Sequence, residues 1–256
     1  MSIDLPPLYD ALEFLSPLSD ARADELAGWL AAGVADGGTV LDVGCGWGEL
    51  ALRVAAAAPL ARVIGIDLDE TRIAEACRRA GVRGLPERAT FLVTDGVAAG
   101  PSPVEGLVAI GATQVWGPAV AEGQPLDYGA ALAAMRARLV RGGRVVYADG
   151  IWSRSPTREA TAPLSGRDDE FVSLPDLVGL AVGQGFAVAG VREATLDEWD
   201  AFESGYTAGY ATWLAEHDPA HPDAAEVRAR ADRQRTGYLR GYRGVLGMAY
   251  LQLIAI

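Results

Sequence analysis

The chain has 256 residues, half of them hydrophobic, and a formal net charge of −12 at pH 7. This length suits one large α/β domain, or one domain with an insertion. An acidic chain repels phosphate backbones, so nucleic acid is not an expected partner. No apolar run reaches the roughly 18 residues of a membrane span, and residues 1–10 lack a basic and apolar leader. We therefore expect a cytoplasmic protein that does not contact membranes.

Helix and strand patterns alternate along the first 150 residues. Apolar spacing predicts a helical region over residues 8–34, with a break at Ser16-Pro17 and Ser19 as the cap of its second part. Apolar strands are predicted at 39–43, 62–67, 89–95, 107–111 and 144–149, and helices at 49–58, 70–80 and 128–139. This alternation is typical of a doubly wound parallel sheet with helices on both faces.

The last third of the chain has a different pattern. The final two strands are predicted at 187–192 and 245–256, and the stretch between them is helical, charged and rich in aromatic residues. We interpret residues 1–256 as one domain. Its parts are N-terminal helices (1–36), a sheet core (37–195), a helical lid insertion (196–243) and a last strand (244–256). The loops 111–125 and 150–169 follow strands at the edge where ligands bind in such folds.

A glycine-rich turn joins the first strand to its helix. Gly44, Gly46 and Gly48 alternate directly after the strand, and Glu49 opens the helix. The glycines allow a sharp turn and a close approach of the backbone to a ligand. A dinucleotide would place its pyrophosphate at this helix start. A carboxylate there would compete with it, although Glu49 could also simply complement the helix dipole.

Two acids end the next two strands. Asp67 lies 67 − 44 = 23 residues after the first glycine, near the spacing at which an acid meets ribose hydroxyls. Asp95 ends the following strand, where it could accept a hydrogen bond from an adenine amino group. Each alone is explained as a turn former or a helix cap. Their order and register favour a nucleoside site.

With these motifs, residues 38–150 resemble the class I S-adenosylmethionine-dependent methyltransferases, and the wider pattern is similar to their small-molecule, type 11 branch. The resemblance implies a Rossmann-like doubly wound sheet of seven strands and S-adenosylmethionine as the cofactor. It implies that Val108 to Thr113 line the methyl-donor side. The cofactor-binding residues expected from it are Asp42, Gly44, Cys45, Gly46, Gly48, Asp67, Leu68, Asp95, Gly96 and Gly111.

The sequence departs from one branch of that family. Methyltransferases that act on amino groups of DNA or of protein glutamine carry Asn/Asp-Pro-Pro-Tyr/Phe after the fourth strand. Here the corresponding stretch is Gly111-Ala112-Thr113-Gln114-Val115-Trp116-Gly117. We therefore expect a small-molecule acceptor, with methyl transfer driven mainly by positioning and desolvation.

Candidate bases and metal ligands are few. Asp149 follows the fifth strand, and Glu203 lies on the first helix of the insertion; both are weak candidates for a catalytic base. An enzyme that only places the methyl group should tolerate Asp149→Asn. His217 and His221 flank prolines in what we interpret as an exposed turn, so no metal site is predicted. Cys45 and Cys77 are expected as free thiols.

The insertion carries an aromatic helix face. Trp199, Phe202, Tyr206, Tyr210 and Trp213 recur at spacings of three or four residues. The face could pack on the sheet as core, or form a lid over an apolar or aromatic acceptor. The acceptor-binding candidates are Gln114, Trp116, Trp152, Tyr206, Tyr210 and Tyr242.

Two other functions remain open at the sequence level. A methyltransferase fold could use the adenosyl cofactor for lyase, cyclase or hydroxylase chemistry, or serve as a binding subunit. An NAD-dependent oxidoreductase is a more distant alternative, which binding of NADH in place of S-adenosylmethionine would favour. The oligomeric state is also open, and a homo-oligomer is compatible with the sequence.

Overall fold

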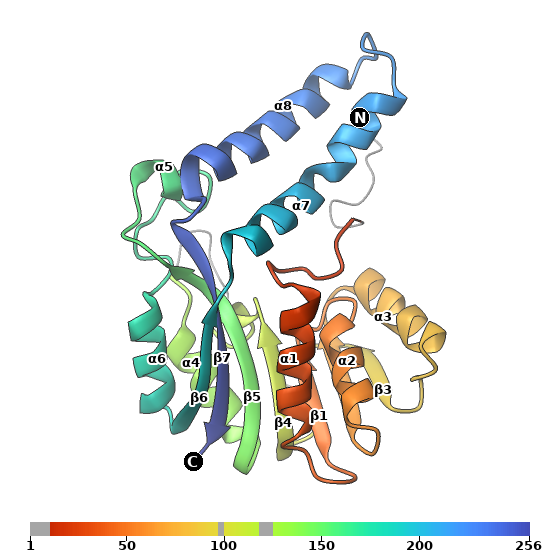
Figure 1. The fold of residues 1–256 in the computed structure, drawn as a ribbon, viewed down its shortest axis with the longest axis vertical. Coiled ribbons are helices and arrows are strands. Elements are labelled where there is room, and N and C mark those ends of the chain that lie inside the picture. Colours follow the sequence, from red (N-terminus) through yellow and green to blue (C-terminus); the bar gives the residue numbers. More distant parts are fainter. Residues whose placement is uncertain (1–10, 97–99, 118–124) are drawn as a thin grey trace.

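The computed structural model describes residues 11–96, 100–117 and 125–256, which form one mixed sheet with helices on both faces (Figure 1). The seven strands stand in the order β3-β2-β1-β4-β5-β7-β6, and only β7 runs antiparallel to its neighbours. Their bounds are β1 Thr39–Val43, β2 Arg62–Asp67, β3 Ala89–Val93, β4 Val104–Ile110, β5 Leu139–Trp152, β6 Phe186–Glu193 and β7 Leu246–Ala255. The predicted seven-stranded Rossmann-like fold is confirmed.

Helices cover the two faces of the sheet unequally. One face packs against α1 (Asp20–Ala31), α2 (Glu49–Ala57) and α3 (Glu70–Val82), and the other against α4 (Tyr128–Ala137) and α6 (Leu174–Gly183). Strand residues alternate between the two cores, so Val40 faces the first core and Leu41 the second. Asp42 therefore shares the first face, with the helices that follow the glycine turn.

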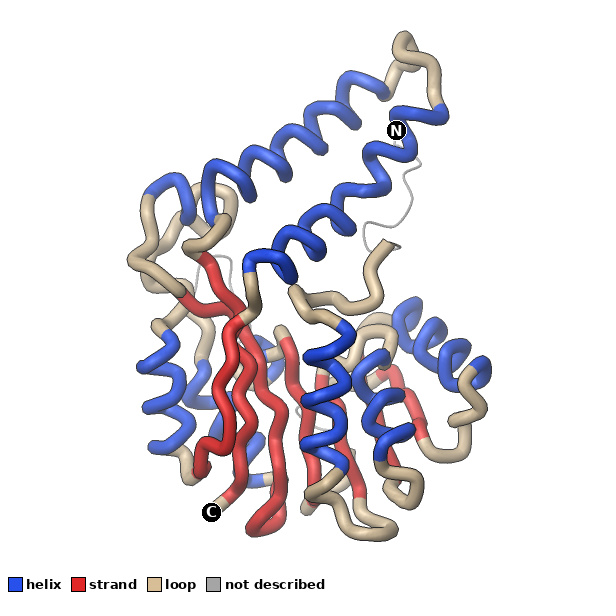
Figure 2. The backbone as a smooth tube through the Cα atoms, in the orientation of Figure 1, coloured by secondary structure: helices blue, strands red, loops and turns tan. Residues whose placement is uncertain are grey.

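A helical hairpin stands above the carboxyl ends of the parallel strands (Figures 1 and 2). It consists of α7 (Leu196–Glu216) and α8 (Ala224–Thr236), followed by a π-helical segment, Gly237–Tyr242, that leads into β7. The hairpin has a small core of its own, formed by Tyr210, Trp213, Ala224 and Val227. Among the described residues, no helix has the length and apolarity needed to cross a membrane.

The expected helix over residues 8–34 is wrong in its first part. Residues 11–18 form turns and bends, and only α1, capped by the Ser19 hydroxyl as predicted, is helical. Leu12 and Leu15 have helical spacing, but they contact different partners: Leu12 meets Gly205 of α7, and Leu15 meets Gly46. Tertiary contacts in two directions therefore replace a single helix face. The start of the prediction, residues 8–10, lies outside the described residues.

Two further elements were not expected from the sequence. The loop predicted at 150–169 begins with the end of β5 and contains a short helix, α5 (Arg158–Thr161). Helix α6 had no sequence prediction, although Ser173 caps it and Pro175 lies in its first turn. Both signals are typical of a helix start and were available in the sequence.

Candidate functional site

The glycine turn between β1 and α2 is tightly packed against its neighbours. Gly46 and Gly48 have φ values of 54° and 74°, which L side chains rarely adopt. A Cβ on Gly48 would lie 2.4 Å from the Phe91 ring, and one on Gly46 would lie 2.8 Å from Leu15. The turn therefore requires glycine both for its backbone angles and for its close neighbours.

Asp67 holds this turn from the end of β2. One carboxylate oxygen accepts from the Gly46 amide at 2.8 Å, and the other accepts from the Asp69 amide at 3.0 Å. The Gly44 and Cys45 amides both donate to the Ile66 carbonyl. Each oxygen of Asp67 retains a further lone pair for a ligand hydroxyl.

The segments after β2 and β3 continue the same edge. Leu68 is strongly exposed, and Asp95 is exposed too. Gly96 is buried where a Cβ would meet Val43 and Val115 at 2.8 Å. The structure therefore brings the predicted residues from the ends of β1, β2 and β3 to one edge of the sheet, as their register predicts.

Asp42 is a buried carboxylate at the centre of this edge. Only 4% of it is exposed, and burial, together with the nearby Asp67 charge, raises its pKa to about 7. Within the described residues its pKa is not lowered by any arginine or hydrogen-bond donor. A ligand with positive charge or with hydroxyl donors would relieve this unfavourable burial.

A small cavity of about 60 Å³, open to solvent, lies beside Asp42. Its walls come from the glycine turn, from the start of α2, from β4 and from residues 14–18. The lining residues are Phe14, Leu15, Ser16, Leu18, Asp42, Gly44, Cys45, Gly46, Trp47, Glu49, Leu50, Val108 and Ile110. The contribution of residues 14–18 was missed by the sequence analysis. The available signal was the apolar pair Phe14-Leu15 directly before the Ser16-Pro17 break, which the sequence analysis assigned to a helix.

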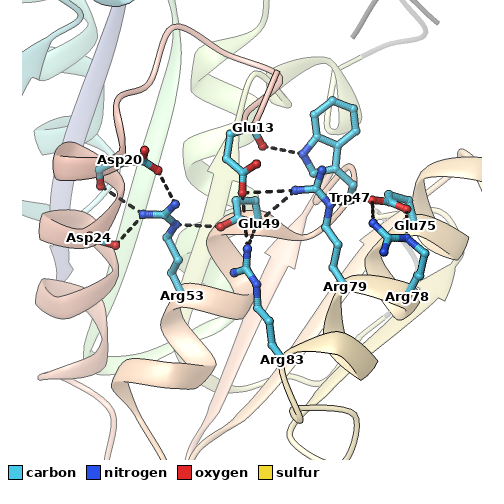
Figure 3. Close-up of polar contacts among 10 residues, drawn as sticks. All are labelled: Glu13, Asp20, Asp24, Trp47, Glu49, Arg53, Glu75, Arg78, Arg79 and Arg83. Carbon is cyan, nitrogen blue, oxygen red and sulfur yellow. Dashed lines mark hydrogen bonds and ion pairs between the residues drawn. The ribbon is translucent and has the colours of Figure 1, made fainter. Parts of the chain in front are cut away.

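Glu49, the first residue of α2, is held by arginines (Figure 3). Its buried carboxylate pairs with Arg53 at 2.9 Å, with Arg79 at 3.2 Å and with Arg83 at 2.6 Å. The Trp47 ring lies under the Arg79 guanidinium, 5.1 Å from its centroid. Glu49 is thus engaged by the protein itself, in addition to complementing the helix dipole.

The end of β4 is held by Asp149 of β5. The Asp149 carboxylate accepts from the Thr113 amide at 3.0 Å and from the Gly150 amide at 2.7 Å. Burial raises the pKa of Asp149, and these hydrogen bonds partly offset the rise. Asp149 faces the α4 and α6 side of the sheet, since its β7 partner Ala249 belongs to that core. It does not line the cavity beside Asp42.

The other predicted residues at this end are dispersed. Gln114 is exposed and donates to the carbonyl of Gly111, and Trp116 packs against the core on the α4 side. Trp152 is buried, donates to the Asp168 carbonyl and packs edge-on against Phe171. Trp152 is therefore a core residue.

Three predicted tyrosines line a separate hollow beneath the hairpin. Tyr206, Tyr210 and Tyr242 line it together with arginines of α8 and with Pro163 and Leu164. Tyr242 donates to Glu203 at 2.7 Å, and Gln234 donates to the other carboxylate oxygen of Glu203 at 2.8 Å. Glu203 is therefore paired within a buried network and is not oriented as a free base.

The two histidines belong to the tip of the hairpin. His217 stacks on Trp213 with ring centroids 3.9 Å apart, and His221 meets the same ring edge-on. Both are half-buried, whereas residues 218–220 between them are exposed, as expected for a turn. No cluster of metal-ligating side chains occurs in the described parts of the chain. Cys45 and Cys77 are free thiols, and burial raises the pKa of Cys45.

Comparison with known proteins agrees with this geometry. Residues 40–143 match a family model described as a methyltransferase domain. The uncharacterized protein YjhP of Escherichia coli K12 is 29% identical over 224 residues, which is 86% of this chain and 85% of YjhP. The domain match covers β1 to the start of β5, and so includes the glycine turn, Asp67 and Asp95.

Solved structures share the fold. A SAM-dependent methyltransferase from Geobacter sulfurreducens, in complex with S-adenosyl-L-homocysteine, superposes with a TM-score of 0.81 at 24% identity, over 98% of this chain and 96% of that one. The [4+2]-cyclase SpnF superposes with a TM-score of 0.62 at 21% identity, over 92% of this chain and 82% of that one. Residues 40–143 thus match a methyltransferase domain, and the whole chain has the fold of these solved structures. The predicted resemblance to methyltransferases is confirmed by the domain match.

Proposed function

We propose that the chain transfers a methyl group from S-adenosylmethionine to a small-molecule acceptor, mainly by positioning the two molecules and excluding water. The observation that carries this proposal is the buried Asp42 carboxylate beside a glycine turn held by Asp67. A buried anion next to a glycine turn suits a cationic nucleoside ligand better than a pyrophosphate.

The residues of the sheet edge fit the parts of that cofactor. Asp42 and the glycine turn would hold the methionine part, because they supply a carboxylate and unhindered backbone. Asp67 would accept the ribose hydroxyls, with Leu68 beside it, and Asp95 with Gly96 would hold the adenine. Gly111 would contact the methyl-donor side.

When bound, the cofactor supplies a methyl group that is already activated by its sulfonium. The chain's own residues then need to orient it and keep water out. Phe14, Leu18 and Ile110 give the cavity apolar walls. Of its carboxylates, Asp42 is buried and Glu49 is paired with arginines, so neither is arranged as a base for an acceptor. This supports catalysis by placement.

The hollow beneath the hairpin is the best candidate for the acceptor side. Its tyrosines, Tyr206, Tyr210 and Tyr242, offer aromatic walls. Arg230 and Arg233 also line it, and both pair with Glu226. Aromatic faces favour flat apolar bodies and cations. An aromatic or apolar small molecule fits these walls, which do not include Gln114 or Trp116. The burial and contacts of Trp152 give it no such role.

An acceptor screen tests the proposal. The purified chain is incubated with S-adenosylmethionine and pools of aromatic and apolar small molecules, and S-adenosylhomocysteine is measured. The proposal predicts its formation only in pools that contain a methyl acceptor, with one methyl group gained by the product. Asp36→Asn, an exposed acid in the turn before β1, serves as an active control.

The cyclase fold relative supports a second candidate, non-methylating chemistry on the same fold. The same screen separates the two functions. A product that forms with no S-adenosylhomocysteine would contradict methyl transfer and favour the second candidate.

A further inference from the structure

Residues 11–18 form an irregular segment, here named the strap, that lies across the cofactor cavity. Phe14, Leu15, Ser16 and Leu18 line that cavity. The Leu15 methyl group lies 2.8 Å from the point that a Cβ on Gly46 would occupy, so the strap is in direct van der Waals contact with the glycine turn. No ligand can pass between the two while this contact holds.

A polar cluster holds the strap on the turn (Figure 3). Trp47 donates its Nε1 hydrogen to the Glu13 carbonyl at 2.7 Å. The Glu13 carboxylate lies 3.6 Å from Arg79 and 3.4 Å from Arg83. Both arginines also reach Glu49, and Arg79 in addition lies over the Trp47 ring. Arg79 connects the strap, the turn and the start of α2.

The neighbouring Arg78 offers a contrast. It lies next to Arg79 on α3, and both arginines pair with Glu75, Arg78 through two hydrogen bonds of 2.7 Å and Arg79 through one of 2.9 Å (Figure 3). Arg79 reaches on to Glu13 and Glu49, whereas the Arg78 side chain is 64% exposed, against 17% for Arg79. Loss of Arg78 therefore removes the same charge from the same helix without touching the strap.

The other side of the strap contacts α7. A Cβ on Gly205 would lie 2.3 Å from a Leu12 methyl group, so Leu12 packs directly on the helix. Just after the strap, Ser19 donates to Glu198 in the first turn of α7 at 2.7 Å. The residue after Gly205, Tyr206, lines the hollow beneath the hairpin. The strap thus touches the cofactor cavity and the acceptor-side helix at once.

We propose that the strap is a gate on the cofactor site, that Arg79 holds it closed, and that through Leu12 it couples cofactor occupancy to α7. The inference rests on the proposed function, because it concerns the same cofactor site. The gate opens for the cofactor to enter and for S-adenosylhomocysteine to leave. Closure over a bound ligand presses Leu12 on Gly205, and so orders the first turns of α7.

The rate of S-adenosylhomocysteine release tests whether Arg79 holds the strap closed. S-adenosylhomocysteine is bound to the full chain, and its release is followed in a stopped-flow instrument by tryptophan fluorescence. Loss of partly exposed ion pairs predicts release about three-fold faster in Arg79→Gln than in the wild type. Arg78→Gln, the matched control, keeps the wild-type rate. Equal release rates for Arg79→Gln and Arg78→Gln would overturn the gate.

Hydrogen exchange tests the coupling. In the wild type, S-adenosylhomocysteine should slow amide exchange both in residues 14–18 and in residues 196–206. In Gly205→Ala, whose added methyl group displaces Leu12, the ligand should still protect residues 14–18 but no longer residues 196–206. Gly179→Ala on α6, where a Cβ meets no atom within 4 Å, should behave as the wild type.

The outcomes separate this inference from the proposed function. A wild-type chain that binds S-adenosylhomocysteine without any protection of residues 196–206 overturns the coupling and leaves the cofactor assignment intact. A wild-type chain that does not bind S-adenosylhomocysteine overturns the assignment itself, and the gate with it.

Discussion

At the scale of single residues, the buried position of Asp42 disfavours its negative charge. Burial and the nearby Asp67 raise its pKa to about 7, whereas an unfolded chain has an Asp pKa of about 3.9. The folded state therefore retains a proton that the unfolded state has lost. Stability contributed by the protonated form falls as the pH rises from about 4 through about 7.

This gives a prediction for Asp42→Asn. The variant lacks the buried charge, so its unfolding free energy in the absence of ligand should exceed that of the wild type by about 4 kcal/mol at pH 8, since the pKa of Asp42 rises from about 4 in the unfolded chain to about 7 in the folded one. The two should agree closely at about pH 3, where Asp42 is protonated in both the folded and the unfolded chain. Thermal unfolding at both pH values, with Asp36→Asn as an exposed control, measures the difference. A variant less stable than the wild type at pH 8 would contradict the account.

Asp149 has a structural role, because both of its carboxylate oxygens accept backbone hydrogen bonds. Asparagine has one acceptor oxygen, so Asp149→Asn directs an amino group at one of the two amides. Its unfolding free energy should fall by about 1 to 2 kcal/mol. The expectation that an enzyme which only places the methyl group keeps its activity in this variant stays a prediction. Urea unfolding measures the effect. Unchanged stability with abolished activity would instead indicate a catalytic base.

At the scale of elements, structure that depends on neighbouring residues was predicted better than structure that depends on contacts between distant parts of the chain. The strand, glycine turn and start of α2 follow from neighbouring residues, and Ser19 was identified as a cap. The strap could not be predicted, because Leu12 and Leu15 contact elements about 190 and 30 residues away in the sequence. Helix α6 was missed despite its Ser173 cap and Pro175, which are local signals.

The joint between α1 and α7 depends on Glu198. Its carboxylate accepts from Arg22, from the Ser19 hydroxyl and from the Thr195 amide. Burial opposes ionisation, but these donors outweigh it and lower the pKa of Glu198 to about 2. The stabilisation is therefore complete above the unfolded pKa of about 4.3 and is lost as the pH falls towards 2.

For Glu198→Gln, we expect the unfolding free energy at pH 7 to fall by about 2 kcal/mol, because charged hydrogen bonds are lost. The difference from the wild type should shrink as the pH is lowered from 4 to 2. Glu226→Gln, which removes an exposed carboxylate paired with Arg230, should change stability little. Denaturant unfolding across this pH range measures both. A constant difference at all pH values would contradict the assignment of the stabilisation to the ionised carboxylate.

At the scale of the whole molecule, the sheet gathers residues that are far apart in the chain. Asp42, Asp67 and Asp95 each end a strand or follow one, and parallel neighbours bring them to one edge. This half of the site could be predicted, since it depends on register alone. The acceptor half could not, because it depends on how the hairpin stands on the sheet. Tyr242 and Glu203, 39 residues apart, meet only through that arrangement.

The central claim is that this sheet edge binds S-adenosylmethionine. Calorimetric titration of the chain with S-adenosylmethionine, S-adenosylhomocysteine and NADH tests it most directly, with Asp67→Ala and the exposed-acid control Asp36→Ala in parallel. We predict micromolar binding of both adenosyl ligands by the wild type and the control, at least ten-fold weaker binding by Asp67→Ala, and no binding of NADH. A ten-fold change corresponds to about 1.4 kcal/mol. Binding of NADH with no binding of either adenosyl ligand would contradict the account.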